Sequence, residues 1–241
     1  MDWILLIIIA IIFTSAFIRS AFGFGDALVA MPLLALFISL NTATPLIGLC
    51  AITYTILILY KEWRAVKYKD VLVLIITAFI GIPVGIYFLK GNYDQIMKLI
   101  LGFILILFAS FNIFKPKLFY LKSDKFAFIF GFIAGILGGA INTNGAAVVI
   151  YSSLRKWDPK TFRATMQGFF LPTGFMIAIS HGISGLWTKE VVMNYVYALP
   201  FIFLALYLGS LVNKRIQKEK FNIYIFLLLL VLGVLLIIKN I

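Results

Sequence analysis

The chain has 241 residues, of which 63% are hydrophobic and 12% charged, and its mean hydropathy is +1.08. Average soluble domains are about half apolar and about a quarter charged, so this composition excludes a soluble globular protein. The formal net charge is +12, but the cations lie in short stretches between apolar runs, as the positive-inside rule predicts for membrane proteins, and this placement argues against nucleic-acid binding. The single cysteine, Cys50, excludes an internal disulfide and a cysteine-based metal cluster, and we interpret it as a small buried apolar residue.

Apolar runs that resemble membrane spans follow one another along the whole chain. Backbone polar groups in lipid must be satisfied within their own segment, so we predict that the runs are helices and that the protein is an all-α, polytopic membrane protein. The chain start lacks the positive region of a signal peptide, so we expect the first run to remain as a membrane segment. The predicted segments are 3–18, 24–40, 43–60, 71–89, 96–114, 126–141, 145–154, 164–182, 191–212 and 222–238.

Two neighbouring pairs of segments are joined without a loop. The junctions are residues 19–26, called the first tip below, and residues 138–145, called the second tip. Both contain glycine and polar residues inside otherwise apolar stretches. We interpret each junction as the tip of a helical hairpin, and whether a hairpin spans the bilayer or turns at mid-membrane is left open.

The cations indicate which connections face the cytoplasm. If four cation-rich stretches are cytoplasmic, the connections at 38–43, 90–95 and 183–190 face outward, and so do both chain ends. This arrangement is self-consistent only if each hairpin enters and leaves on one side, the first opening outward and the second inward. The four stretches contain Lys61, Arg64, Lys67 and Lys69; Lys115, Lys117, Lys122 and Lys125; Arg155, Lys156, Lys160 and Arg163; and Lys214, Arg215, Lys218 and Lys220.

Two halves, 1–120 and 121–241, have the same order of elements, a hairpin followed by three spans. Gly25 aligns with Gly145, and Gly85 aligns with Gly209 ahead of the last span of each half. A hairpin gives no net crossing and three spans give an odd number, so we predict that the repeats are inverted. Inverted repeats with broken elements near the midplane are typical of secondary transporters.

Arg19 and Asp26 are the charged residues that fall away from the predicted loops, and both flank the first tip. Charges inside the membrane usually face a cavity or a partner. We expect an anion site in which Arg19 and Ser20 bind the ligand, while Gly23 and Gly25 let backbone N–H groups and a helix N-terminus approach it. Two alternatives stay open: the charged pair only locks the tip, or Asp26 is a carboxylate that couples transport to protons.

The second tip contains the neutral polar residues Asn142, Thr143 and Asn144, followed by Gly145. Amide and hydroxyl donors suit an oxyanion without adding charge. The alternative is that these side chains satisfy free backbone groups at the turn. If the halves are inverted, both tips approach the midplane and form one substrate site with Arg19 as its full cation.

Other positions receive weaker interpretations. Gln167 is expected to line a path, and Arg163 to anchor the topology at the cytoplasmic edge. His181 is expected to have a capping or interfacial role, because a single histidine binds no metal alone. Residues 81–85 and 131–135 have small residues four apart, a pattern typical of close helix packing.

The sequence contains no recognisable catalytic or nucleotide-binding motif. We therefore expect a protein that is not an enzyme, has no metal or cofactor, and depends on secondary rather than ATP-driven coupling. The expected partners are a small anionic substrate and the lipid bilayer, with no nucleic acid, and assembly into a homo-oligomer is left open.

The glycine-rich tips carry a family resemblance. Residues 21–25 leading to Pro32, and residues 131–139 leading to Tyr151, resemble the two signatures of the TauE/SafE family of sulfite exporter-like permeases. The resemblance implies transport of small sulfur-containing anions, such as sulfite or organosulfonates, across the cytoplasmic membrane. The family often has a further glycine where Asp26 stands, and an acid there disfavours a multiply charged anion unless Arg19 neutralises it. The alternative to this function is a proton-coupled carrier of another small solute that uses Asp26.

Overall fold

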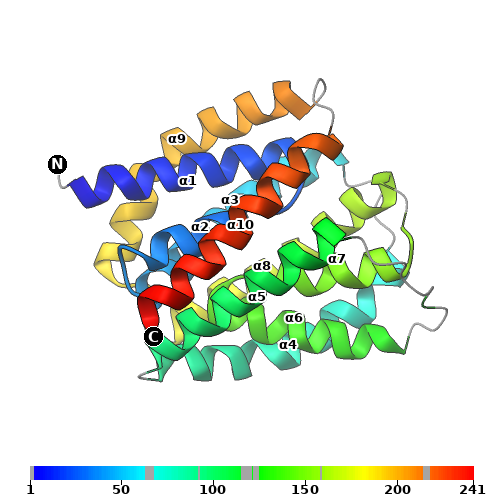
Figure 1. The fold of residues 1–241 in the computed structure, drawn as a ribbon, viewed down its shortest axis with the longest axis horizontal. Helices are drawn as coiled ribbons and strands as arrows, with labels where there is room; N and C mark the ends of the chain where they lie inside the picture. Colours follow the sequence, from blue (N-terminus) through cyan, green and yellow to red (C-terminus); the bar gives the residue numbers. More distant parts are fainter. Residues whose placement is uncertain are drawn as a thin grey trace.

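The computed structural model describes residues 3–62, 68–91, 93–114, 121, 125–157, 159–213 and 218–241. Within these ranges the protein consists of ten α-helices (Figure 1), which confirms the predicted all-α fold. Each helix overlaps one of the predicted segments. The helices are α1 (Trp3–Phe22), α2 (Asp26–Ala35), α3 (Leu40–Glu62), α4 (Tyr68–Lys90), α5 (Asp94–Phe114), α6 (Phe126–Ile141), α7 (Asn144–Leu154), α8 (Pro159–Ile183), α9 (Lys189–Asn213) and α10 (Lys218–Asn240).

Six helices of the described residues, α1, α3, α4, α5, α9 and α10, are long and apolar enough to cross a membrane. This finding confirms a polytopic membrane protein. The second arm of each hairpin is short, because α2 has 10 residues and α7 has 11. At 1.5 Å per residue each arm is roughly 15 Å long, about half of the hydrocarbon core. The hairpins therefore pair one longer helix with one half-length helix. Of the predicted segment 24–40, Asp26–Ala35 form α2, and Leu40 already begins α3.

Glycines allow α4 and α6 to pack along each other at close range. A β-carbon on Gly81 would collide with the Phe132 carbonyl oxygen, and one on Gly135 would collide with the carbonyl of Ala78. Further along the same interface, a β-carbon on Gly85 would collide with the carbonyl of Ile136. The prediction that residues 81–85 and 131–135 mark close helix packing is therefore confirmed, and the two patterns pack against each other.

The first hairpin packs on α9 in the same manner as the second packs on α4. Gly209 of α9 lies against α1, where an added β-carbon would be 2.6 Å from the Phe17 carbonyl oxygen and 2.8 Å from the β-carbon of Ser20. Gly85 of α4 and Gly209 of α9, which the sequence aligns, thus each lie against the first helix of one hairpin, α6 and α1 respectively. In Figure 1, α9 runs beside α1 and α4 beside α6.

Two further helix pairs run antiparallel between the halves. On α3 and α8, Gly48 faces His181 while Gly174 faces Ile52. On α5 and α10, Gln95 donates to the Asn240 carbonyl at one end, and the rings of Phe108 and Phe226 meet further along the pair. A two-fold axis in the membrane plane would make such equivalent helices antiparallel. The packing supports the inverted-repeat prediction and the division between 1–120 and 121–241, both of which stay predictions.

The predicted sidedness depends on cations that the structure covers only in part. Arg64, Lys67, Lys115, Lys117, Lys122, Lys214 and Arg215 lie outside the described residues, as do the side chains of Lys61, Lys69, Lys160, Arg163, Lys218 and Lys220. The cytoplasmic assignment of these stretches and the anchor role of Arg163 therefore stay predictions. In Figure 1 the start of α1 and the end of α10 lie at the same end of the bundle, which is consistent with the predicted topology.

Candidate functional site

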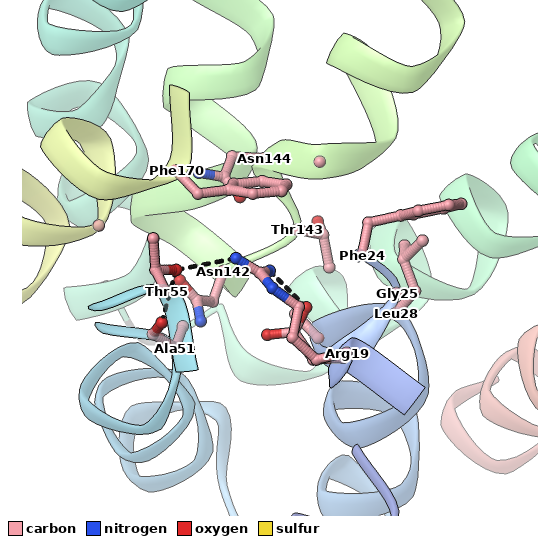
Figure 2. Close-up of a pocket in the computed structure, with 14 residues that line it drawn as sticks. Arg19, Phe24, Gly25, Leu28, Ala51, Thr55, Asn142, Thr143, Asn144 and Phe170 are labelled. Carbon is pink, nitrogen blue, oxygen red and sulfur yellow. Dashed lines mark hydrogen bonds and ion pairs between the residues drawn. The ribbon is translucent and has the colours of Figure 1, made fainter. Parts of the chain in front are cut away.

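A cavity of about 30 Å³ lies where the two hairpin tips meet between α3 and α8 (Figure 2). The first tip and the start of α2 contribute Arg19 and residues 24–28, and the second tip contributes residues 142–145. Ala51 and Thr55 line the cavity from α3, and Phe170 and Gly174 from α8. The structure thus brings seven of the predicted site residues together around one space: Arg19, Gly25, Asp26, Asn142, Thr143, Asn144 and Gly145.

Arg19 is buried with a relative exposure of 2%. Its Nη1 donates to Asp26 Oδ1 at 2.8 Å, so the predicted ion pair is present. Its Nη2 donates to Thr55 Oγ1 at 2.8 Å and to Gln167 Oε1 at 3.1 Å, and the guanidinium carbon lies 4.2 Å from the centre of the Phe170 ring. Figure 2 shows the guanidinium reaching from the first tip into the space between Thr55 and Phe170.

Local helix chemistry favours these positions for the two charges. Arg19 lies in the last turn of α1 and Asp26 in the first turn of α2. A cation at a helix C-terminus and an anion at a helix N-terminus are both stabilised by the aligned peptide dipoles. Gly23 and Gly25 have φ angles of 88° and 95°, so the turn between the helices uses the left-handed conformation that glycine tolerates best.

Two helix N-termini line the cavity without a side-chain cap. α2 begins after Gly25 and α7 after Thr143, and neither residue caps its helix through a side-chain hydrogen bond. The first N–H groups of an α-helix have no acceptor within the helix and carry its partial positive charge. The residues that bear these groups, 26–28 of α2 and 144–145 of α7, all line the cavity.

The second tip closes its turn with backbone bonds. Asn142 has a left-handed conformation with φ of 53°, its N–H donates to the Gly138 carbonyl, and the N–H of Thr143 donates to the Leu137 carbonyl. The first of these is the 5→1 bond of the αL motif that ends α6. The polar side chains are not needed for that turn, contrary to the alternative that they satisfy its backbone.

The side chains of the second tip therefore remain available to the cavity. Thr143 Oγ1 is buried and has no hydrogen-bond partner among the described residues. Asn144 Nδ2 makes a long hydrogen bond of 3.4 Å to Thr173 Oγ1. A buried hydroxyl without a partner is costly unless a ligand or water completes it.

Three predicted site residues do not line the cavity. Ser20 turns toward α9, where its Oγ donates to the Leu206 carbonyl at 2.7 Å. Gly23 contributes its carbonyl to Gln167 Nε2 at 2.6 Å rather than an N–H to the cavity. Gln167, expected to line a path, is fully buried and links Arg19 to the Gly23 carbonyl. Ser20 and Gly23 thus do not line the cavity in this structure, their role as ligand contacts stays a prediction, and Gln167 holds the first tip.

His181 holds the second tip in a corresponding way. Its Nε2 donates to the Gly139 carbonyl at 3.0 Å, and Thr44 Oγ1 donates to the Ala140 carbonyl at 3.4 Å. Both acceptors lie near the C-terminus of α6, where carbonyls lack helical partners. His181 has a relative exposure of 0%, so the expected capping role is confirmed and the interfacial one is wrong.

The sequence interpretation did not identify Thr55, Phe170 or Thr173. Each lies inside a long apolar helix, and the two threonine hydroxyls also bond the carbonyl four residues earlier. Threonine satisfied in this way is common in membrane helices and gives no separate signal. The positions of Thr55 and Phe170 in the sequence therefore give no indication of a site.

Residues 7–236 match a family model described as "Sulfite exporter TauE/SafE". The match includes both hairpin tips and all residues that line the cavity. Comparisons with curated proteins and with solved structures gave no match.

Proposed function

The chain belongs to the TauE/SafE family of sulfite exporters, and from this premise we propose that it is a secondary transporter of small anions, namely sulfur-containing oxyanions such as sulfite or organosulfonates. The observation that carries this proposal is the convergence of a buried arginine and two uncapped helix N-termini on one cavity. Helix N-termini and arginine are the common donors for oxyanions in proteins. We further propose that this multi-pass protein lies in the cytoplasmic membrane.

The donors around the cavity suit an oxyanion. Arg19 Nε and Thr143 Oγ1 are buried without partners among the described residues, and the residues that begin α2 and α7 line the same cavity. Phe24, Leu28 and Phe170 supply an apolar side. An anion with a small apolar substituent, such as a short sulfonate, would meet both kinds of surface.

The cavity volume indicates a closed state. A volume of about 30 Å³ has room for roughly two water molecules by the usual probe measure, which is too little for an oxyanion. The tips must therefore separate to admit substrate. The Arg19 contacts to Thr55 and Gln167 hold the first tip to α3 and α8, and the His181 and Thr44 contacts hold the second tip to the same two helices. Alternating release of these two sets of contacts would expose the site to one side at a time.

The experiment that tests this function measures uptake of radiolabelled sulfite and methanesulfonate into liposomes containing the purified protein. The wild type should transport at least one of them without chemical change to it. Arg19→Ala should abolish transport, and Arg19→Lys should retain part of it because charge is kept while the planar donor set is lost. Lys98→Ala, which removes a part-buried cation that pairs with Asp94 outside the cavity, is the control. Unchanged transport by Arg19→Ala would contradict the proposal.

A further inference from the structure

The protein itself occupies much of the guanidinium of Arg19. A guanidinium has five N–H donors, and three hydrogen bonds connect that of Arg19 to Asp26, Thr55 and Gln167. Phe170 covers one face of the group. Its Nε is buried without a partner among the described residues, but an anion cannot take the side held by Asp26 unless that carboxylate is displaced or neutralised.

The charge balance of the cavity also indicates that Asp26 must be displaced or neutralised before an anion binds. Arg19 and Asp26 are the charged residues among those that line it, and their exposures are 2% and 4%. The pair is neutral, so a bound monovalent anion would leave a net negative charge in a buried site, which is unfavourable. The helix ends offset this only in part, because Asp26 already occupies the first turn of α2 and each helix N-terminus supplies about half a charge.

Asp26 has one carboxylate oxygen that is free to accept a proton. Oδ1 accepts the bond from Arg19, whereas Oδ2 has no hydrogen bond among the described residues, and the residue lines the cavity. The described groups that face Asp26 from the helices packed around it include one charge, that of Arg19. They are Arg19 from α1; Cys50, Tyr54 and Thr55 from α3; Phe170 from α8; and Asn142, Thr143 and Asn144 from the second tip. The described charges of α5 and α10, Asp94, Lys98 and Lys239, lie at the far ends of those helices.

We propose that the site takes up one proton with each monovalent anion, and that Asp26 receives the proton. The proton binds to Oδ2 of Asp26, and the ion pair between Asp26 and Arg19 is then released. The anion takes the place of the carboxylate and binds beside Arg19 and the N-terminus of α7. The site holds one positive and one negative charge before binding, and the same after binding, with Asp26 as a neutral acid. This inference rests on the proposed transport of anions and adds that the transport is electroneutral and driven by a pH gradient.

The first test uses the wild type in liposomes with methanesulfonate, an anion whose own charge does not change near neutral pH. A pH gradient without a membrane potential should drive accumulation, and a potassium diffusion potential without a pH gradient should not. In weakly buffered detergent solution, binding of methanesulfonate should remove about one proton per anion from solution, as reported by a pH-sensitive dye. Accumulation driven by the potential alone, or binding without proton uptake, would overturn the inference while leaving anion transport intact.

The second test uses Asp26→Asn, which mimics the neutral acid, with Asp94→Asn as the matched control, since Asp94 pairs with Lys98 outside the cavity. Asp26→Asn should bind methanesulfonate at least as tightly as the wild type, with the same affinity at acidic and at neutral pH and without proton uptake. Asp94→Asn should keep the wild-type pH dependence. Proton uptake retained by Asp26→Asn would overturn the inference. Failure of the wild type to bind or transport both methanesulfonate and sulfite would overturn the proposed function as well.

Discussion

Gln167 of α8 accepts a hydrogen bond from Arg19 Nη2 of α1 at 3.1 Å, although the two residues are 148 positions apart in the chain. The same amide donates to the Gly23 carbonyl at 2.6 Å. One side chain from the second half therefore holds both the cation and the backbone of the first tip. These bonds must break before the first tip can move away from α8. The position of Arg19 is therefore coupled to the packing of this tip on α8.

Replacement of Gln167 should weaken transport through this contact. Gln167→Leu leaves the Gly23 carbonyl and one Arg19 donor buried without a partner, at a cost of about 1–3 kcal/mol for such a group. We expect uptake of methanesulfonate to fall by about tenfold or more and the thermal unfolding temperature to decrease. Gln95→Leu is the control, because Gln95 bonds the Asn240 carbonyl at an exposed position. Equal uptake by Gln167→Leu and Gln95→Leu would show that the link has no role in transport.

The Thr143 hydroxyl offers a test of the second tip. Its Oγ1 is buried and unpartnered, so Thr143→Val should leave stability unchanged or slightly raised, while anion affinity falls by about tenfold if the hydroxyl bonds the anion. Isothermal titration with methanesulfonate and thermal unfolding measure the two effects. Thr165 also has a buried hydroxyl without a partner but does not line the cavity. Thr165→Val should therefore bind the anion like the wild type, and a similar loss in both variants would refute the assignment.

The matching glycines of the two hairpin interfaces should respond alike to substitution. Gly85→Ala would force the α4–α6 pair apart, and Gly209→Ala would do the same to α1 and α9, since both β-carbons collide with backbone carbonyls. Overpacking of this kind costs about 1–3 kcal/mol. Thermal unfolding in detergent should show a lower midpoint for both variants. Gly174→Ala should show little change, because its β-carbon would make an ordinary 3.7 Å contact with Ile52.

Cysteine labelling tests the inverted topology. The native Cys50 is fully buried, so the wild type should react little with a membrane-impermeant maleimide. Val66→Cys lies in a predicted cytoplasmic connection outside the described residues, and Trp187→Cys lies in a predicted outer one. We expect the first to be labelled from the cytoplasmic side and the second from outside. Labelling of both from the same side would reject the inverted arrangement of the halves.

Sequence alone was sufficient to place the helices and the two tips. Apolar runs determine where backbone can cross lipid, because an unsatisfied peptide group in hydrocarbon is too costly outside a helix. Glycines 23 and 25 and the Asn142–Gly145 stretch interrupt those runs locally, and the structure places turns at both. The pairing of Arg19 with Asp26 could also be predicted from the sequence, because the two residues are seven positions apart.

Tertiary structure decided which side chains face the cavity. Ser20 follows Arg19 directly, yet its hydroxyl bonds α9 while Arg19 points to α3 and α8. The rotation of a helix about its axis depends on how it packs, and apolar membrane helices show little amphipathic pattern from which that rotation can be read. For the same reason Thr55, Gln167 and Phe170 acquired their places around Arg19 only when helices from both halves packed together. Hydropathy determined the elements, and close packing at the glycine-lined interfaces determined the site.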